Sequence, residues 1–526
     1  MRFLANAAIL VVLQGGWLAG LAPVQAAAAE TKPASRPPNI LFIYTDQQRY
    51  DTLAVYGNEK IDMPNLNALA GQSTVFMRAY PSSPICSPSR STMLTGTYPH
   101  QNGVITNNIP IRPTTRCLPE YLPEGKWRTA HMGKWHLGDE IYAQHGFTVW
   151  KGTEDTYHHW YSDEHDEYAD RSAYHHWLKE RGVKPQEHAN VAGQPWLVDR
   201  FFRGQIHSLP EAHCRPKYLG ETASQFIRDH AKEPFILYVN FLEPHHPYHS
   251  ARDRQYDPSE VVLPPNYGVP FTDQHNRAAV AAGRRGQQEQ SEEQLRETIA
   301  RYWGMNSLVD TYCGQILDTL EETGADERTI VVFTTDHGDM MGEFGLGGKS
   351  VMYEASARIP LLVRLPGQTR QRKIDSPVSH IDLVPTLLDF VGSEWAEKLP
   401  GKSLMPALRG EQEETGRDVF VQWNLPPRSR QAGVRPIATG MSEISEDEGL
   451  AAARAQQIRT IVSPDRWKFN YSSSGDHELF HLKEDPHERV NLYGHAQHAA
   501  KVRELAGRIL AWQEKTGDVL ALPRLE

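Results

Sequence analysis

Three short apolar runs stand out along a chain in which apolar and polar positions otherwise mix. They cover residues 39–44, 234–242 and 329–334. Runs of this length and character predict strands buried on both faces, as in a parallel sheet. Acidic residues and histidines follow each run directly. Because open α/β sheets hold their ligands at the carboxyl ends of the strands, we expect ligand-binding side chains at these three positions.

A long helix is predicted before the third run. A capping box of Ser291 and Gln294 opens a segment whose apolar residues recur at helical spacing as far as Leu320, and Gly324 follows. This apolar stripe is typical of a helix packed on a core. A shorter helix followed by a strand is predicted within residues 64–80.

The pattern changes near a charge-rich stretch at residues 410–416, which indicates a boundary. Beyond it, short alternating segments predict strands at 418–423, 458–462 and 467–471, and helical spacing returns at 502–512.

Composition narrows the class of protein. The chain has 526 residues, of which 23% are charged and 39% hydrophobic, as in ordinary soluble globular proteins with more than one domain. Its net charge of −10 argues against a broad nucleic-acid-binding surface. With only four cysteines, a disulfide framework is not expected to hold the fold together.

Residues 1–26 have the pattern of a secretory signal peptide: Arg2, an apolar stretch and a small-residue cleavage site ending at Ala26. An uncleaved membrane anchor is the alternative, but Gln14 and two glycines interrupt the apolar stretch. No later segment is apolar enough to span a bilayer. We therefore expect an exported protein, periplasmic or secreted, without a transmembrane anchor.

The segment around Cys86 combines three chemical features. Cys86 precedes a predicted helix start, where Ser87 is suited to cap and Pro88 to occupy the first turn. Helix N-termini attract anions, and Arg90 follows one turn later on the face of Cys86. A buried cysteine before an ordinary helix is the alternative.

These residues, Cys86-Ser87-Pro88-Ser89-Arg90, resemble the C-x-P-x-R signature of the type I sulfatases of the alkaline phosphatase-like superfamily. Further stretches match that family in order: Asp46-Gln47, Gly133-Lys134-Trp135-His136, Pro244-His245-His246-Pro247, Asp336-His337, Gly348-Lys349 and a C-terminal Asp485-Pro486 element. Each stretch alone has an ordinary structural explanation, such as a capping aspartate or a surface lysine. Their joint occurrence from about Pro38 to the last helix favours the sulfatase reading.

The resemblance implies a nucleophile and a metal site. In this family the cysteine, here Cys86, is converted by a formylglycine-generating enzyme to formylglycine, whose hydrate attacks sulfur. One divalent cation is then held by an oxygen at position 86 together with four further residues, Asp46, Gln47, Asp336 and His337. Calcium is the first expectation. Gln47 and His337 depart from the commonest Asp-Asp and Asp-Asn pattern, which leaves manganese and zinc open.

The resemblance also implies roles for the basic residues and histidines in the matching stretches. Arg90 would orient the nucleophile, and Lys134 and Lys349 would hold sulfate oxygens. His245 is the candidate acid for the leaving oxygen, and His136 the candidate for elimination or for contacting the nucleophile. If residues 134–136 are extended, Lys134 and His136 share one face.

The fold implied is α/β: a large mixed, mostly parallel sheet sandwiched by helices, with a smaller C-terminal α+β subdomain of an antiparallel sheet plus a helix. The implied domains are a catalytic domain at residues 37–409 and a subdomain at 410–526 after the signal peptide.

The substrate is less defined. Residues 150–177 mix aromatic, histidine and acidic residues without a regular period and are interpreted as a long loop. Such a loop suits recognition of a sulfated sugar, although a surface loop without function fits equally well. A phosphoester or phosphonate monoester hydrolase, or a non-catalytic carbohydrate-binding relative, are the alternatives. The sequence does not indicate an oligomeric state.

Overall fold

The three apolar runs form adjacent parallel strands at the centre of one sheet. Strand β1 (Asn39–Thr45) pairs in parallel with β5 (Phe235–Asn240) on one side and with β6 (Thr329–Thr335) on the other. Every residue of these strands is buried, as their continuous apolar character predicts. The structure, a computed structural model, describes residues 36–154, 171–185, 201, 203–269, 291–424 and 456–525.

The sheet has eight strands in the order β4-β3-β5-β1-β6-β7-β2-β8. Only β7 runs antiparallel to its neighbours, so the predicted mixed, mostly parallel sheet is confirmed. The remaining strands are β2 (Thr74–Tyr80), β3 (Arg128–Gly133), β4 (Val149–Gly152), β7 (Leu361–Arg364) and β8 (Arg372–Ser379).

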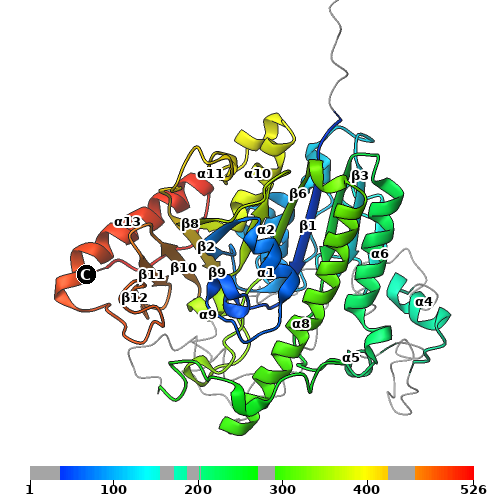
Figure 1. Ribbon diagram of the computed structural model, residues 1–526. Helices are drawn as coiled ribbons and strands as arrows, with labels where there is room; N and C mark the ends of the chain where they lie inside the picture. The colour runs from blue at the N-terminus through cyan, green and yellow to red at the C-terminus, as the bar shows by residue number, and fades with distance from the viewer. Residues whose placement is uncertain are drawn as a thin grey trace, which may run out of the picture. The chain divides into compact units, whose positions relative to one another are not determined.

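Helices cover both faces of this sheet (Figure 1). Alternate residues of β1 face opposite cores: Leu41 and Ile43 pack in one cluster, and Ile40 and Phe42 in the other. The first cluster includes residues of α1 (Pro64–Gly71), α4 (Ala173–Glu180), α6 (Arg215–His230) and α8 (Glu292–Glu322). The second includes residues of α2 (Cys86–Thr95), α10 (Leu383–Phe390) and α11 (Met405–Arg409).

The predicted long helix is α8, and its capping box forms as expected. The Ser291 hydroxyl accepts the N–H of Gln294, whose side chain accepts the N–H of Ser291. Gly324 follows in the left-handed conformation, at φ 66°. Further short α-helices are α3 (Pro99–Asn102), α5 (Arg203–His207) and α9 (Glu354–Ala357).

A second, antiparallel sheet of four strands has the order β12-β11-β10-β9. Its strands are β9 (Val419–Trp423), β10 (Ile458–Val462), β11 (Trp467–Ser472) and β12 (Glu478–His481). Helix α13 (Ala499–Thr516) packs on one face of this sheet through Val502, Leu505 and Ile509. The predicted combination of a small antiparallel sheet and a helix is therefore confirmed, while the boundary at residue 410 stays a prediction.

The interpretation of residues 150–177 as one loop was wrong at both ends. Trp150 belongs to β4, and Trp177 lies in α4, where the Ser172 hydroxyl caps the helix by accepting the N–H of His175. Residues 155–170, which carry most of the predicted aromatic loop, and the predicted signal peptide lie outside the described residues. Within the described residues, no helix combines the length and the apolar character needed to cross a bilayer.

All four cysteines are unpaired and buried. The expectation that disulfides do not hold the fold together is confirmed.

Candidate active site

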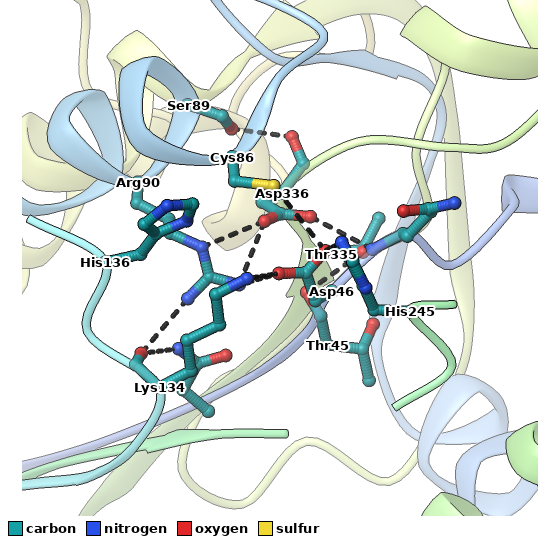
Figure 2. A network of polar contacts seen from close by, with 12 residues as sticks. Thr45, Asp46, Cys86, Ser89, Arg90, Lys134, His136, His245, Thr335 and Asp336 are labelled. Carbon is teal, nitrogen blue, oxygen red and sulfur yellow. Dashed lines mark hydrogen bonds and ion pairs between the residues drawn. The ribbon is translucent and has the colours of Figure 1, made fainter. Parts of the chain in front are cut away.

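The carboxyl ends of β1, β3 and β6 deliver polar side chains to one place (Figure 2). Asp46 follows β1, Lys134 follows β3, and Asp336 follows β6. Helix α2 begins beside them with Cys86, whose side chain is buried at 1% exposure. Residues distant in sequence thus meet because parallel strands end at the same edge of the sheet.

Arg90 connects the two aspartates. Its guanidinium donates to Asp46 Oδ2 at 2.8 Å and to Asp336 Oδ2 at 2.9 Å. Lys134 Nζ also lies 2.7 Å from Asp46 Oδ2. Burial acts to raise the pKa of Asp46, but neighbouring cations, Lys134 above all, hold it well below its usual range. The carboxylate of Asp46 is therefore ionised in a fully buried position.

One oxygen of each aspartate is held by these cations, and the other faces Cys86 and His337. Asp46 Oδ1 lies 3.7 Å from His337 Nε2 and 3.8 Å from Cys86 Sγ. Asp336 Oδ1 lies 3.4 Å from the same imidazole nitrogen. Burial alone lowers the pKa of His337, but the attraction of Asp336 reverses the shift and raises it. The pocket between these atoms favours positive charge.

This donor set fits a divalent cation. One ligand atom from each of Asp46, Cys86, Asp336 and His337 can be chosen so that all lie within 4.8 Å of one another, and all four residues are buried. Gln47 adds a carbonyl oxygen on the same side, since its Oε1 accepts from Lys349 Nζ at 2.8 Å. Carboxylate, amide and imidazole donors suit calcium, manganese or zinc.

Lys349 completes the surroundings of Cys86. Its Nζ lies 3.1 Å from Cys86 Sγ, and it is 12% exposed, more than the other site cations. Burial and Asp46 raise the pKa of the Cys86 thiol, but Lys349, followed by Lys134, outweighs them and brings it to about 7. Position 86 is thus an anion-stabilising position next to a cation at the rim of the site.

Comparison with known proteins identifies the family. The family model described as "Sulfatase" matches residues 38–393. The chain belongs to the sulfatase family. It is 24% identical, over 91% of its length and 82% of the relative's, to an ulvan-active sulfatase of Formosa agariphila. It is 25% identical to an N-acetylglucosamine-6-O-sulfatase of Bacteroides thetaiotaomicron, over 93% and 88% of the two chains.

Among solved structures, a phosphonate monoester hydrolase from Silicibacter pomeroyi has a similar fold. The TM-score is 0.72 at 23% identity, and the match covers 91% of this chain and 96% of the other. This likeness confirms the predicted alkaline phosphatase-like fold. On that fold, Asp46, Lys134 and Asp336 lie at strand ends, and the Cys-x-Pro-x-Arg residues form the start of α2.

The start of α2 differs from the sequence prediction. Cys86 is the first helical residue and Ile85 occupies the N-cap position without a side-chain hydrogen bond, so the prediction that Ser87 caps this helix was wrong. The Ser87 hydroxyl instead donates to the carbonyl of His136 at 2.8 Å. This bond ties helix α2 to the Gly133-Lys134-Trp135-His136 segment.

That segment is not extended. The prediction that Lys134 and His136 share one face assumed that it was. Strand β3 ends at Gly133, and His136 adopts a left-handed conformation at φ 59°. Gly133 is required because a Cβ there would lie 1.9 Å from the carbonyl oxygen of Asn240. A buried carboxylate, Glu140, accepts the N–H groups of Trp135 at 2.8 Å and of His136 at 2.5 Å.

The two predicted catalytic histidines lie on opposite sides of the aspartates (Figure 2). His245 Nε2 is 4.0 Å from Asp46 Oδ1, and its Nδ1 pairs with the carbonyl of His246 at 2.6 Å. His136 Nε2 lies 2.8 Å from Asn108 Oδ1. Burial lowers the pKa of both imidazoles well below the usual value, so both are neutral at pH 7.

All predicted site residues therefore gather at one edge of the sheet. Sequence reasoning missed four residues that hold them in place: Asn108, Glu140, Tyr248 and Asp339. Asp339 alone had a signal, since it belongs to the Asp-His-Gly-Asp run that carries Asp336. Asn108 and Glu140 lie in loops without a distinguishing pattern.

Proposed function

We propose that this sulfatase hydrolyses sulfate esters of a carbohydrate, with residue 86 as the nucleophile. The observation that carries the proposal is the position of Cys86, 3.1 Å from Lys349 Nζ and beside the buried Asp46, Asp336 and His337 cluster. The relatives named for ulvan and for N-acetylglucosamine 6-O-sulfate support a sulfated sugar as the substrate.

The proposed enzyme carries two additions to the bare chain. A formylglycine-generating enzyme converts Cys86 to formylglycine. One hydroxyl of its hydrate attacks sulfur as the bond from sulfur to the sugar oxygen breaks. The second hydroxyl then loses its proton and expels sulfate, which restores the aldehyde for hydration by water. One divalent cation, with Ca²⁺ as the first choice, supplies Lewis acidity that favours the ionised hydroxyl. Its ligands would come from residue 86 and from Asp46, Gln47, Asp336 and His337.

The cations of the chain bind and stabilise the sulfate group. Lys349 and Lys134 lie close enough to the nucleophile to hold sulfate oxygens as negative charge grows on them. Arg90 holds both aspartates in place, so that their second oxygens face the metal position. Preorganised charges of this kind need no rearrangement during the reaction.

His245 is the proposed acid for the leaving oxygen. Because its Nδ1–H donates to the carbonyl of His246, Nε2 is the nitrogen that exchanges a proton with substrate. Burial is the largest cause of the low pKa of His245, and Lys349 lowers it further. A bound sulfate anion would offset the charge of Lys349 and favour protonation of Nε2. His136, held by Asn108, is proposed to assist sulfate release.

Hydrolysis of phosphate or phosphonate monoesters is the second candidate. It is favoured by the Gln47 and His337 departures from the commonest metal set, and by the fold shared with a phosphonate monoester hydrolase. Sulfate monoesters carry one negative charge and phosphate monoesters carry two near pH 7. Comparing kcat/KM for matched aryl sulfate and aryl phosphate substrates therefore separates the two functions.

The decisive experiment measures the mass of the peptide containing residue 86 after expression with the converting enzyme and export by a signal peptide. Conversion of the thiol to the aldehyde lowers the mass by about 18 Da, and activity on sulfated oligosaccharides should rise with the converted fraction. Cys117→Ser, at another buried cysteine, is the matched control and should leave both unchanged. An unmodified thiol in an active enzyme would refute the proposal.

A further inference from the structure

The amide of Gln47 is held in one orientation. Its Nε2 donates to Asp339 Oδ2 and to the Tyr248 hydroxyl, the latter at 3.1 Å, while its Oε1 accepts from Lys349 at 2.8 Å. The backbone is fixed as well, because the N–H of Gln47 donates to Asp336 Oδ1 at 3.0 Å. Gln47 has φ 70°, a conformation that side-chain-bearing residues seldom adopt.

Asp339 is a fully buried carboxylate surrounded by neutral donors. Its Oδ1 accepts the N–H groups of Met341 at 2.8 Å and Gly348 at 3.1 Å, and its Oδ2 accepts from Gln47 and, at 2.5 Å, from Tyr248. In these contacts the amide nitrogen of Gln47 is the donor and faces Asp339, which turns the amide oxygen toward Lys349 and the Asp46–Cys86 side.

We propose that Asp339 is a positioning residue that, together with Tyr248, presents the Gln47 carbonyl oxygen to the divalent cation. This inference rests on the metal site of the proposed function. Gln47 and Asp339 then form a matched pair: the amide at position 47 donates an N–H to Asp339, and a carboxylate at position 47 has no N–H to donate.

A purely structural role for Asp339 would give a different result. Through Met341 and Gly348 it also shapes the loop that leads to Lys349, so its substitution will cost stability in either case. Asp310 offers a matched control. It is buried at 1% exposure and accepts the N–H of Leu66 and the side-chain amide of Asn65, away from the metal position. Asp310→Asn should lower stability and leave cation affinity unchanged.

The test is a double-substitution cycle read out by binding of Ca²⁺, and in parallel Mn²⁺, to the chelator-treated full-length protein by calorimetry. Asp339→Asn should weaken binding about 10- to 100-fold, as loss of partners of metal ligands generally does. Gln47→Glu places a carboxylate of the same shape against Asp339. Adding Asp339→Asn to that variant should strengthen binding at least tenfold, so the sign of the Asp339 effect reverses.

Other outcomes overturn the inference in distinguishable ways. If the parent protein binds neither cation, the metal part of the proposed function fails and this inference fails with it. If the parent binds one ion and Asp339→Asn binds it within about threefold, or weakens binding equally in both backgrounds, only the inference is wrong. Should Asp339→Asn not fold, Tyr248→Phe replaces it, with an expected loss of two- to fivefold in affinity that is absent in Gln47→Glu.

Discussion

Two buried charged clusters in this protein have opposite balances of charge. At the active site, the three cations Arg90, Lys134 and Lys349 contact the carboxylates of Asp46 and Asp336. In the small sheet, Lys468 of β11 contacts two carboxylates, Glu354 at 3.0 Å and Glu488 at 2.8 Å. Both clusters are almost wholly shielded from solvent, so neither excess is screened by water.

The two clusters differ in how their excess charge is neutralised. In the Lys468 cluster, burial and Glu354 raise the pKa of Glu488 to about 8, so a proton neutralises the excess negative charge at pH 7. At the active site, three cations face two carboxylates, so a bound anion, such as the sulfate ester of the proposed substrate, would balance the excess positive charge.

The largest effect is expected when the cation of the Lys468 cluster is removed. Lys468→Ala leaves Glu354 buried without its cation, and should lower the free energy of unfolding by about 3–5 kcal/mol. The kcat of the folded fraction should stay within about twofold of the parent. Urea unfolding at pH 7 measures the loss, and Glu488→Gln, which imitates the protonated acid, serves as the control with a loss under about 1 kcal/mol. Equal losses in the two variants would contradict the charge assignment.

At the active site, removing a cation should affect rate more than stability. Lys349→Ala should lower kcat by about 10²- to 10³-fold, equivalent to about 3–4 kcal/mol, because its Nζ faces the reacting residue. Because Asp46 keeps its contacts with Arg90 and Lys134, the cost in stability should be about 1 kcal/mol. Steady-state kinetics on an aryl sulfate, with thermal unfolding beside them, test this contrast. A stability loss as large as that of Lys468→Ala would remove the distinction between the clusters.

Removing the divalent cation should destabilise the site cluster selectively. With free Ca²⁺ at about 100 times its dissociation constant, chelation should lower the free energy of unfolding by about 2.7 kcal/mol. The same treatment should have no effect in Asp336→Asn, which lacks one ligand carboxylate. Differential scanning fluorimetry with and without chelator provides the measurement, and an equal shift in both proteins would place the ion elsewhere.

The smallest expected effect concerns a buried group outside both clusters. His131 packs among aromatic rings, stacked on Trp150 with ring centroids 4.6 Å apart, and burial lowers its pKa to about 3. Unfolding lets this imidazole bind a proton below about pH 6.5. The stability that it contributes is thus complete at pH 7 and falls as the pH decreases, by about 2 kcal/mol at pH 5.

His131→Phe should remove that part of the pH dependence. Denaturant unfolding at pH 7 and pH 5 should show a difference about 2 kcal/mol smaller than in the parent. Burial also lowers the pKa of His380 to about 3. His380 should therefore keep its own contribution to the pH dependence of stability in the variant. An unchanged pH dependence would mean that His131 is protonated in the folded protein.

The sequence predicted the central strands because the apolar runs of β1, β5 and β6 are continuous, and Asp46, Asp336 and His337 follow two of these strands directly. The other site residues were predicted from the motifs that resemble the sulfatase family. Strand β8 was not predicted, since Arg372, Asp375 and Pro377 interrupt its apolar pattern. The contacts of Glu140 and Asp339 could not be predicted either. They depend on backbone turns at His136 and Gln47 that enter the left-handed region, which sequence patterns do not reveal for residues other than glycine.

The burial of Cys86 also bears on how the mature protein is made. With 1% of its surface exposed behind the ends of β1 and β6, the thiol offers no access to another enzyme once the sheet has closed. The conversion proposed above would therefore have to occur on the nascent or unfolded polypeptide, in competition with folding. On that proposal, a chain that folds before it is converted would be stable, correctly shaped and inactive, so the yield of active protein would depend on timing as well as on sequence.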